Sequence, residues 1–310
     1  MPRWWNGRHA TLRSLWAKAR ESSNLFLGTK PVNKYLMQLL IGILTSEKID
    51  KLERCIKSVL TQVDPANVVI VINSLDEQYQ NLAVHLSAKY GLKSVVTESN
   101  GRPGKGKNSL LAYFMNSAFT HIVPIDGDDI LLPNAIEKLT AIINDKNPDI
   151  LGLIDGLVLL NDEIIPIEDW QKHEIYFKRG FDNIDPKNYK KFNLHIAKIR
   201  RTSIEYGNMF NRFVVISRKA ASYINYDEEL AGAEDIKQGL LLKLIHLEGK
   251  INYMLLSNQD IYLYDVTDEG VFFNTLCKSD PSTELKRFWH DLSNEQISTL
   301  QTFQLECIYD

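Results

Sequence analysis

Cysteine is scarce in this sequence, and its three copies lie far apart. Cys55, Cys277 and Cys307 form no Cys-x-x-Cys pair and have no spacing that is typical of metal ligands. The pattern gives no support to a disulfide framework or to a zinc site built on cysteine. Because unpaired cysteines are usual in a reducing compartment, we expect the protein to be cytoplasmic.

Long apolar runs are also missing. The longest stretches, 36–44 and 150–160, are too short to cross a bilayer or are interrupted by Asp155, so we expect no transmembrane segment. Residues 1–5 lead into charged residues rather than an apolar stretch, which argues against a secretory signal peptide. A net charge of -3 gives the chain no general attraction to nucleic acid. Its 310 residues should form one large domain or two modest ones.

Residues 1–36 differ from the rest of the chain in charge. Arginine and lysine are frequent there, Glu21 is the one acidic residue, and apolar residues recur at helical spacing. This pattern predicts a basic amphipathic arm, to which Trp4 and Trp5 add aromatic surface. Such an arm could contact an anionic membrane surface or another polyanion, or its apolar face could pack on the main domain.

From residue 39 the sequence alternates between strand and helix patterns. The expected elements, strand first, are 39–44, 48–62, 68–72, 75–90, 92–97, 109–117 and 122–125. Apolar strands that alternate with helices predict an α/β fold, with a mainly parallel sheet covered on both faces.

The second half of the sequence is less regular and predicts a smaller α+β part. We expect strands within 150–160 and at 213–217 and 250–255, and helices at 233–247 and from Ser293 to about residue 306. Residues 161–212 are polar and aromatic, with no clear period.

The acidic cluster after the strand at 122–125 is the most informative feature of the sequence. Asp126, Asp128 and Asp129 fall within four residues, and their like charges repel unless a cation or a hydrogen-bonded ligand compensates them. Aspartate oxygens suit Mg²⁺ or Mn²⁺, which substrate phosphates often complete. At the carboxyl end of a strand, the cluster predicts a metal–diphosphate site. The alternative is that these acids end the strand and favour the dipole of the helix that Pro133 opens.

A glycine-rich segment, 101–108, precedes a predicted helix. It nearly matches the phosphate-binding P-loop, but Asn108 stands where a hydroxyl should bind Mg²⁺, and the segment follows the third strand rather than the first. Lys107 and the N–H groups at a helix N-terminus would still attract phosphate. A solvated turn is the other interpretation.

Two further acids, Glu234 and Asp235, follow small residues at a predicted helix N-terminus. Acids are favoured in a first helical turn, so a capping role would explain them. The functional interpretation is a carboxylate base that reaches a hydroxyl group in a cleft.

In their order, these segments resemble the family 2 glycosyltransferases, which have the GT-A fold. The resemblance covers residues 39 to 263 and rests on 41–45, 55–62, 69–73, 100–108, 125–129, 213–219 and 232–235. It implies a first strand, a Ser-Val-Leu-x-Gln helix, an Asp-x-Asp motif and a Glu-Asp motif. The chain would then divide into the arm 1–36, a nucleotide-sugar-binding half 37–160, an acceptor-side half 161–275 and a C-terminal helical segment 276–310.

The resemblance also implies roles for the matching residues. Asp128 would bind a Mn²⁺ or Mg²⁺ ion on the donor diphosphate, Asp126 would support that ion or face the ribose, and Asp129 would face the donor sugar or the ion. Asp235 would be the general base, and Glu234 would orient either Asp235 or the acceptor. The implied donor-binding residues also include Thr45, Asn73, Lys107 and Asn108.

Three positions depart from the family pattern. Asn73 stands where the family often has aspartate, and Leu241 lies near the place of a usual arginine. The late segment 262–265 lacks the histidine that often binds the metal, and Asp265 or Asp268 could replace it.

We therefore expect a metal-dependent, inverting glycosyltransferase that uses a nucleoside-diphosphate sugar. A saccharide, a lipid-linked glycan and a modified DNA base are all candidate acceptors. A basic cluster within 187–201 supports keeping DNA among these candidates. The alternatives are a P-loop kinase or NTPase and a catalytically inactive GT-A binding domain.

Overall fold

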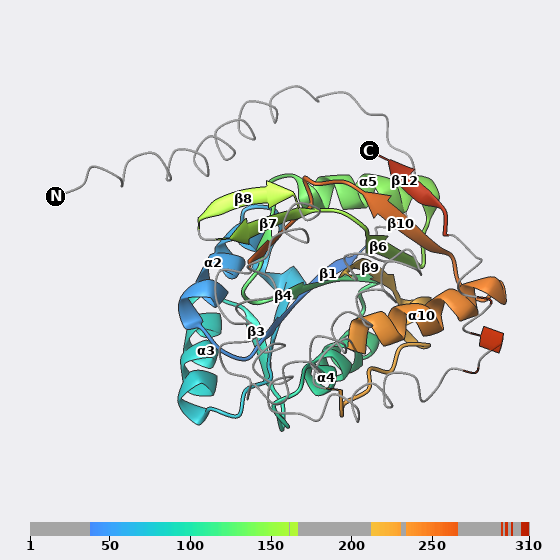
Figure 1. The fold of residues 1–310 in the computed structure, drawn as a ribbon. Helices are drawn as coiled ribbons and strands as arrows, with labels where there is room; N and C mark the ends of the chain where they lie inside the picture. The colour runs from blue at the N-terminus through green and yellow to red at the C-terminus, as the bar shows by residue number, and fades with distance from the viewer. Residues whose placement is uncertain are drawn as a thin grey trace, which may run out of the picture.

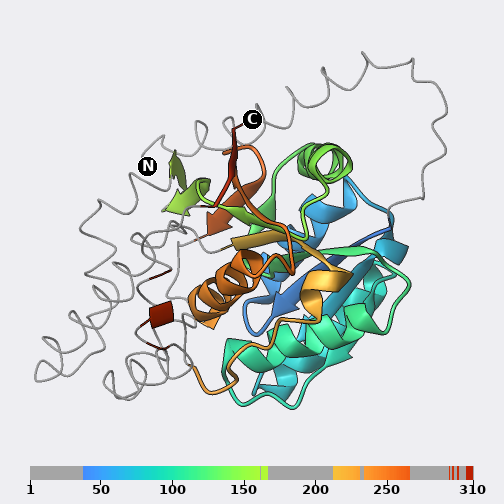
Figure 2. The ribbon, with the colours of Figure 1, turned by 90° about the vertical axis from the view of Figure 1, so that its right-hand side faces the viewer.

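The computed structural model of the protein describes residues 38–160, 162–166, 212–230 and 234–265, together with 293, 295–296, 299 and 305–309. The basic arm 1–36, the basic cluster within 187–201 and Asp268 lie outside the described residues. Within the described part, strands form two sheets, and helices flank the larger one (Figures 1 and 2). None of the described helices is both long enough and apolar enough to span a lipid bilayer.

The larger sheet has eight described strands in the order β12-β10-β6-β9-β4-β1-β2-β3. In chain order these are β1 (Leu39–Thr45), β2 (Val68–Ile72), β3 (Lys93–Val96), β4 (His121–Asp126), β6 (Ile150–Leu153), β9 (Arg212–Ser217), β10 (Tyr253–Ser257) and β12 (Cys307–Tyr309). Among the described pairings of this sheet, β9 alone is antiparallel, and it lies between β4 and β6. The prediction of a mainly parallel α/β sheet is therefore confirmed.

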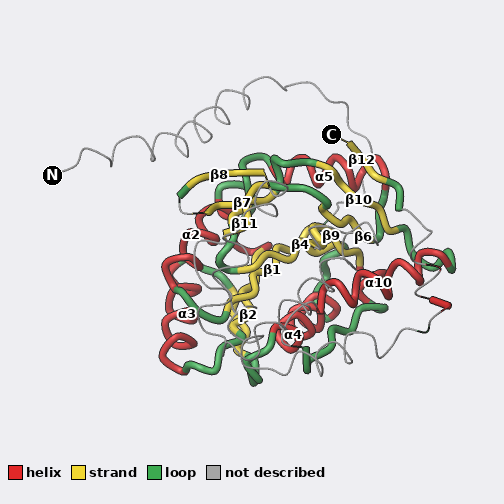
Figure 3. Tube along the Cα trace, viewed as in Figure 1, coloured by secondary structure: helices red, strands yellow, loops and turns green. Residues whose placement is uncertain are grey.

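Helices cover both faces of the larger sheet (Figure 3). One face packs against α2 (Ile49–Leu60), α3 (Glu77–Lys89) and α5 (Ala135–Lys146), and the other against α4 (Pro103–Met115), α9 (Arg218–Ala221) and α10 (Glu234–Leu247). Within β1, Ile41 and Ile43 enter the first core, whereas Leu40 enters the second. Because both faces are buried, these strands need apolar residues on both sides, which explains their continuous apolar pattern.

The smaller sheet has the order β5-β11-β7-β8 and lies beside the acidic turn. Its strands are β5 (Ile130–Leu131), β7 (Leu157–Leu160), β8 (Glu163–Pro166) and β11 (Tyr262–Asp265). β5 follows the acidic turn directly and pairs with β11, so residues of the late segment 262–265 come next to Asp129. A short 3₁₀ helix, η1 (Pro65–Asn67), precedes β2.

Helix α4 begins earlier than the sequence pattern predicts. The glycine-rich segment was expected to be a loop before a helix at 109–117, but α4 starts at Pro103 and includes Gly104 and Gly106. A Cβ atom at Gly106 would lie 2.5 Å from Leu44 Cδ1, and one at Gly104 would lie 2.4 Å from the Asp227 carbonyl oxygen. The glycines serve close helix packing, and the P-loop interpretation is wrong because the segment is helical.

The C-terminal segment also departs from the expected helix. The predicted capping box is confirmed, since the Ser293 N–H donates to Gln296 Oε1 at 2.8 Å and the Gln296 N–H donates to Ser293 Oγ at 3.2 Å. However, Leu305 and Glu306 are not helical, and the next residues form β12, which pairs in parallel with β10. The pairing adds β12 to the larger sheet beside β10.

Candidate active site

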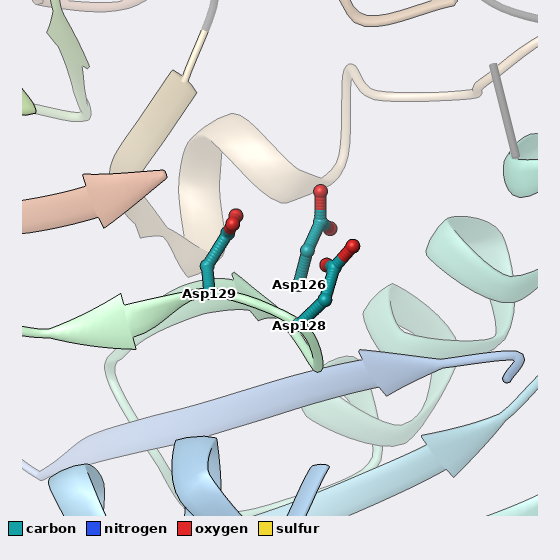
Figure 4. Close-up of side chains that lie close together, drawn as sticks. All are labelled: Asp126, Asp128 and Asp129. Atoms are coloured by element: carbon teal, nitrogen blue, oxygen red, sulfur yellow. The ribbon is translucent and has the colours of Figure 1, made fainter. Parts of the chain in front are cut away.

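The acidic turn at the end of β4 gathers three carboxylates. Asp126, Asp128 and Asp129 each offer an oxygen atom, and these atoms lie within 4.8 Å of one another. Figure 4 shows the three side chains pointing to the same side of the turn. Gly127 leaves no room for a side chain, because a Cβ atom there would lie 2.8 Å from Thr45 Cβ. The glycine lets the turn close against the end of β1.

Asp129 ties this turn to β11. The Asp129 side chain is fully buried, the Tyr262 hydroxyl donates to its Oδ2 at 2.5 Å, and the Asp265 N–H donates to its Oδ1 at 2.9 Å. Burial, with a smaller contribution from the charge of Asp128, raises the pKa of Asp129 well above its usual value. Asp129 therefore has its acceptor oxygens engaged by the protein itself.

Arg212, the first residue of β9, lies among the carboxylates. Its guanidinium donates to Asp126 Oδ2, and its second terminal nitrogen lies 3.4 Å from Asp129 Oδ2. The guanidinium carbon is 4.9 Å from the ring centre of Tyr264 and 5.6 Å from that of Tyr262. No motif in the sequence singled out Arg212. An antiparallel strand beside β4 places its first residue near the carboxyl end of β4, so a charged residue at the start of β9 was the available signal.

The charges of this turn push two neighbouring pKa values apart. Burial and the charge of Asp126 raise the pKa of Asp128 to about 6. Burial also acts to raise the pKa of Asp126, but Arg212 and Lys107 outweigh it and hold that pKa below its usual value. Asp126 therefore stays ionised at neutral pH, while Asp128 titrates in a weakly acidic range.

Asp265, which was considered as a substitute metal ligand, is held by two cations of α2. Its carboxylate forms an ion pair with Lys51 at 3.3 Å and a second one with Arg54. Arg54 also donates to the backbone carbonyl of Asp128 at 2.7 Å. This network joins α2, the acidic turn and β11. The Asp265 carboxylate therefore helps to fix the position of the acidic turn.

The second acidic motif is built around Lys107. The Lys107 ammonium lies 2.5 Å from Glu234 Oε1 and 3.7 Å from Asp235 Oδ2, and it sits 5.3 Å from the ring centre of Tyr226. Burial acts to lower the pKa of Lys107, but the two carboxylates outweigh it and raise that pKa, so the ammonium stays charged. Burial raises the pKa of Glu234 despite this partner. Lys107 thus holds both acids at the start of α10.

The two acidic groups face one cavity. A cavity of about 40 Å³ is lined mainly by apolar side chains, and its polar lining residues include Asp126, Arg212, Lys107 and Asp235. The side chain of Asp235 is 23% exposed, whereas that of Glu234 is 4% exposed. Asp235 is therefore the acid of this pair that a molecule entering the cavity can reach.

The other expected donor-binding residues lie at the carboxyl ends of β1 and β2 or on α4. Thr45 is 4% exposed and hydrogen-bonds the Tyr79 hydroxyl, and the neighbouring Asn73 N–H donates to the Thr45 carbonyl at 2.7 Å. The Asn73 amide accepts from Thr97 Oγ1 at 2.7 Å and donates to the Arg102 carbonyl at 2.8 Å.

Asn108 joins α4 to the loop before α10. Its side-chain amide donates to the Tyr226 carbonyl at 2.9 Å and accepts from the Tyr226 N–H at 2.8 Å. It also donates to Glu228 Oε1 at 3.0 Å. Of the two residues predicted together from the glycine-rich segment, Lys107 lines the cavity, whereas Asn108 braces the loop.

Comparison with known proteins decides the family. A family profile described as "Glycosyltransferase like family 2" matches residues 39–225. The chain belongs to this family. The match starts at β1, includes the acidic turn and Arg212, and ends before Glu234 and Asp235, so the resemblance to the family inferred from the sequence is confirmed. No curated protein matches this glycosyltransferase.

One solved structure supports the fold of this glycosyltransferase. The crystal structure of S. aureus TarS 1-349 in complex with UDP-GlcNAc has a TM-score of 0.51 and 16% identity, covering 86% of this chain and 70% of that chain. The crystal structure of S. aureus TarS has a TM-score of 0.47 and 17% identity, covering 84% of this chain and 42% of that chain. The chain therefore spans less than half of that TarS chain, and at such identities the likeness concerns the fold.

The acidic turn of this glycosyltransferase fits a hard divalent cation in its ligand chemistry. Carboxylate oxygens that converge within 4.8 Å are the ligand type that Mg²⁺ and Mn²⁺ prefer. Asp128 and Asp126 are half-buried, whereas Asp129 is fully buried. Asp128 and Asp126 are thus the two that a cation could reach first, and Arg212 already supplies one positive charge to the group.

Proposed function

We propose that this glycosyltransferase moves a sugar from a nucleoside-diphosphate sugar to an acceptor hydroxyl, with inversion and with the help of Mn²⁺ or Mg²⁺. The observation that carries the proposal is the shared cavity, because both Asp126 and Asp235 line it. A leaving group on one side and a base on the other is the arrangement that an in-line displacement needs.

On the donor side, Asp128 and Asp126 would hold the cation. When bound, the cation would neutralise the charge that develops on the departing nucleoside diphosphate. Asp129 would act on the donor side by fixing the turn, because both of its oxygens accept hydrogen bonds from β11. Thr45 and Asn73 would border the nucleobase at the carboxyl ends of β1 and β2, where open α/β sheets bind nucleotides.

The nucleotide that we would test first is a uridine diphosphate. The related fold of TarS 1-349 was solved in complex with UDP-GlcNAc, which supports a nucleotide-sugar donor for this chain too. Asn73 stands where the family often has aspartate, so the test panel also includes nucleoside diphosphates with other bases.

On the acceptor side, Asp235 would remove the proton from the attacking hydroxyl. Its partial exposure and its place in the cavity wall support this role. Glu234 would position Asp235, because its carboxylate is held by Lys107 at 2.5 Å and is nearly buried. Attack from the side opposite the leaving group produces inversion.

The acceptor class is not narrowed by the described residues. A saccharide, a lipid-linked glycan and a modified DNA base remain candidates, and the basic arm 1–36 would serve a polyanion or a membrane surface. A cytoplasmic location remains a prediction that rests on the free cysteines, and the domain boundaries at 36, 160 and 275 remain predictions as well.

The test is thermal melting of the full chain with a panel of nucleoside diphosphates, with and without Mn²⁺. A ligand at about 100 times its dissociation constant adds about 2.7 kcal/mol of stability. We expect a cation-dependent shift with one nucleotide, followed by turnover of the matching nucleotide sugar, and loss of both in Asp128→Asn. Asp145→Asn, at an exposed position of α5, is the matched control. A shift with ATP alone would contradict the proposed donor class, and no shift with any nucleotide would favour an inactive binding domain.

A further inference from the structure

Arg212 occupies the position of a counter-ion inside the acidic turn. Its guanidinium is paired with Asp126, lies 3.4 Å from Asp129 Oδ2, and has a side chain that is 16% exposed. The rings of Tyr262 and Tyr264 approach the same guanidinium within 5.6 and 4.9 Å. These contacts come from β4, the acidic turn and β11 around a residue of β9, so several elements hold the guanidinium in place.

The carboxylate oxygens that Arg212 uses belong to the group that would bind a divalent cation. A cation on Asp126 would face a positive guanidinium bound to the same carboxylate, and like charges disfavour each other strongly in a buried site. Asp129 offers limited relief, because its oxygens already accept from the Tyr262 hydroxyl and the Asp265 N–H, and one of them also lies 3.4 Å from Arg212. The cation and Arg212 therefore compete for one set of negative charges.

A diphosphate would remove the conflict. A guanidinium is a planar fork with five N–H donors, and it can hold a carboxylate and a phosphate at the same time. The Arg212 side chain is 16% exposed, so part of its fork stays accessible to a phosphate while Asp126 and the two rings hold the rest. The negative charge of a diphosphate would satisfy both the guanidinium and the cation.

We propose that Arg212 acts as a resident competitor of the divalent cation and couples cation binding to nucleotide binding. Without nucleotide, Arg212 neutralises the acidic turn and keeps the cation weakly bound. With a nucleoside diphosphate, Arg212 turns to the phosphates and the cation binds tightly. This inference rests on the proposed use of a nucleoside-diphosphate sugar, and it makes Arg212 a positioning residue for the cation and the donor.

The test measures Mn²⁺ binding to the full chain from the electron paramagnetic resonance signal of free Mn²⁺. In the wild type, we expect saturating UDP to increase Mn²⁺ affinity at least tenfold. In Arg212→Gln without nucleotide, we expect Mn²⁺ to bind roughly tenfold tighter than in the wild type, a factor that matches the lower end of coupling between close charge pairs. UDP should then add much less than it adds in the wild type.

Two variants control for charge and for folding. Lys219→Gln removes a positive charge from α9, where Lys219 is exposed and pairs with Asp149, and it should leave Mn²⁺ affinity unchanged. Arg212→Lys keeps the charge but loses the fork, so it should still oppose Mn²⁺ while losing most of the UDP effect. Circular dichroism melting checks that each variant is folded, and the UDP effect in Arg212→Lys decides the question if Arg212→Gln does not fold.

Opposite results would overturn the inference. Tight Mn²⁺ binding to the wild type without nucleotide, or weaker binding in Arg212→Gln, would show that Arg212 does not compete with the cation. If none of the nucleoside diphosphates in the panel binds, the proposed donor is wrong, whereas tighter Mn²⁺ binding in Arg212→Gln would still support the competition itself.

Discussion

Replacing Lys107 with methionine should destabilise the protein strongly. The Lys107 ammonium is 2.5 Å from the Glu234 carboxylate, and the side chains of these residues are only 16% and 4% exposed. Removing one partner of a buried ion pair leaves the other charge uncompensated and costs about 3–5 kcal/mol. Asp235 lies 3.7 Å from the ammonium and is partly exposed, so water can solvate its charge when Lys107 is gone. We therefore expect a loss of stability near the lower end of that range.

A double-mutant cycle separates the ion pair from the packing of the side chains. Glu234→Gln alone should cost less than Lys107→Met, because Lys107 keeps Asp235 as a second partner. When Lys107→Met is combined with Glu234→Gln, no buried charge is left at Glu234, and at least about 1.5 kcal/mol of the loss should return. Lys105→Met, two positions earlier on α4, is the matched control, because Lys105 forms no ion pair with the described residues and is half-exposed.

Urea unfolding followed by circular dichroism measures the effect. With a denaturant slope of about 3 kcal/mol per molar, the Lys107→Met midpoint should fall by roughly 1 M. In this variant the folded-state pKa of Glu234 rises further above its unfolded value, so the variant gains stability as the pH falls toward that pKa. A Lys107→Met midpoint within 0.2 M of the Lys105→Met midpoint, taking ~0.2 M as the scatter of such measurements, would refute the reasoning.

Four further predictions concern the site and its packing. Because cation ligands must be deprotonated and the pKa of Asp128 is about 6, calorimetry with UDP present should show Mn²⁺ affinity roughly tenfold lower at pH 5 than at pH 7.5; equal affinities would argue against Asp128 as a ligand. Asp235→Asn should lower turnover about 10²–10⁴-fold and keep nucleotide binding, and unchanged turnover would remove Asp235 as the base. Gly106→Ala would bring a Cβ atom 2.5 Å from Leu44 Cδ1, so it should cost about 1–3 kcal/mol in thermal or urea unfolding. If the acceptor is DNA, its binding should weaken about 10³-fold from low to moderate salt, whereas salt-insensitive turnover would exclude it.

Features that depend on neighbouring residues were predictable from the sequence. The continuous Val and Ile residues of β2 indicated a strand at 68–72, which is what the structure has. The acidic turn was predictable for the same reason, because its three aspartates lie within four residues and share one side of the turn. The start of α4 was also predictable, because proline is favoured at the first helical position and Pro103 occupies it.

Features that depend on distant pairing were not predictable. Arg212 reaches Asp126 because β9 runs antiparallel beside β4, and no local pattern reports which strand will lie there. The ion pair of Lys107 with Glu234 joins α4 to α10 across 127 positions of sequence. In the sequence, Lys107 and Glu234 belong to separate motifs. The fold brings them into one cluster.

The place of β9 in the larger sheet has a consequence for biosynthesis. β4 is complete at Asp126, but its partner β9 begins at Arg212, so a nascent chain exposes one edge of β4 until that strand has left the ribosome. An exposed strand edge is a template for pairing with other chains. Chains that end before Ser217 should therefore aggregate. A chaperone that protects the nascent chain should matter most after β4 has left the ribosome and before β9 has done so.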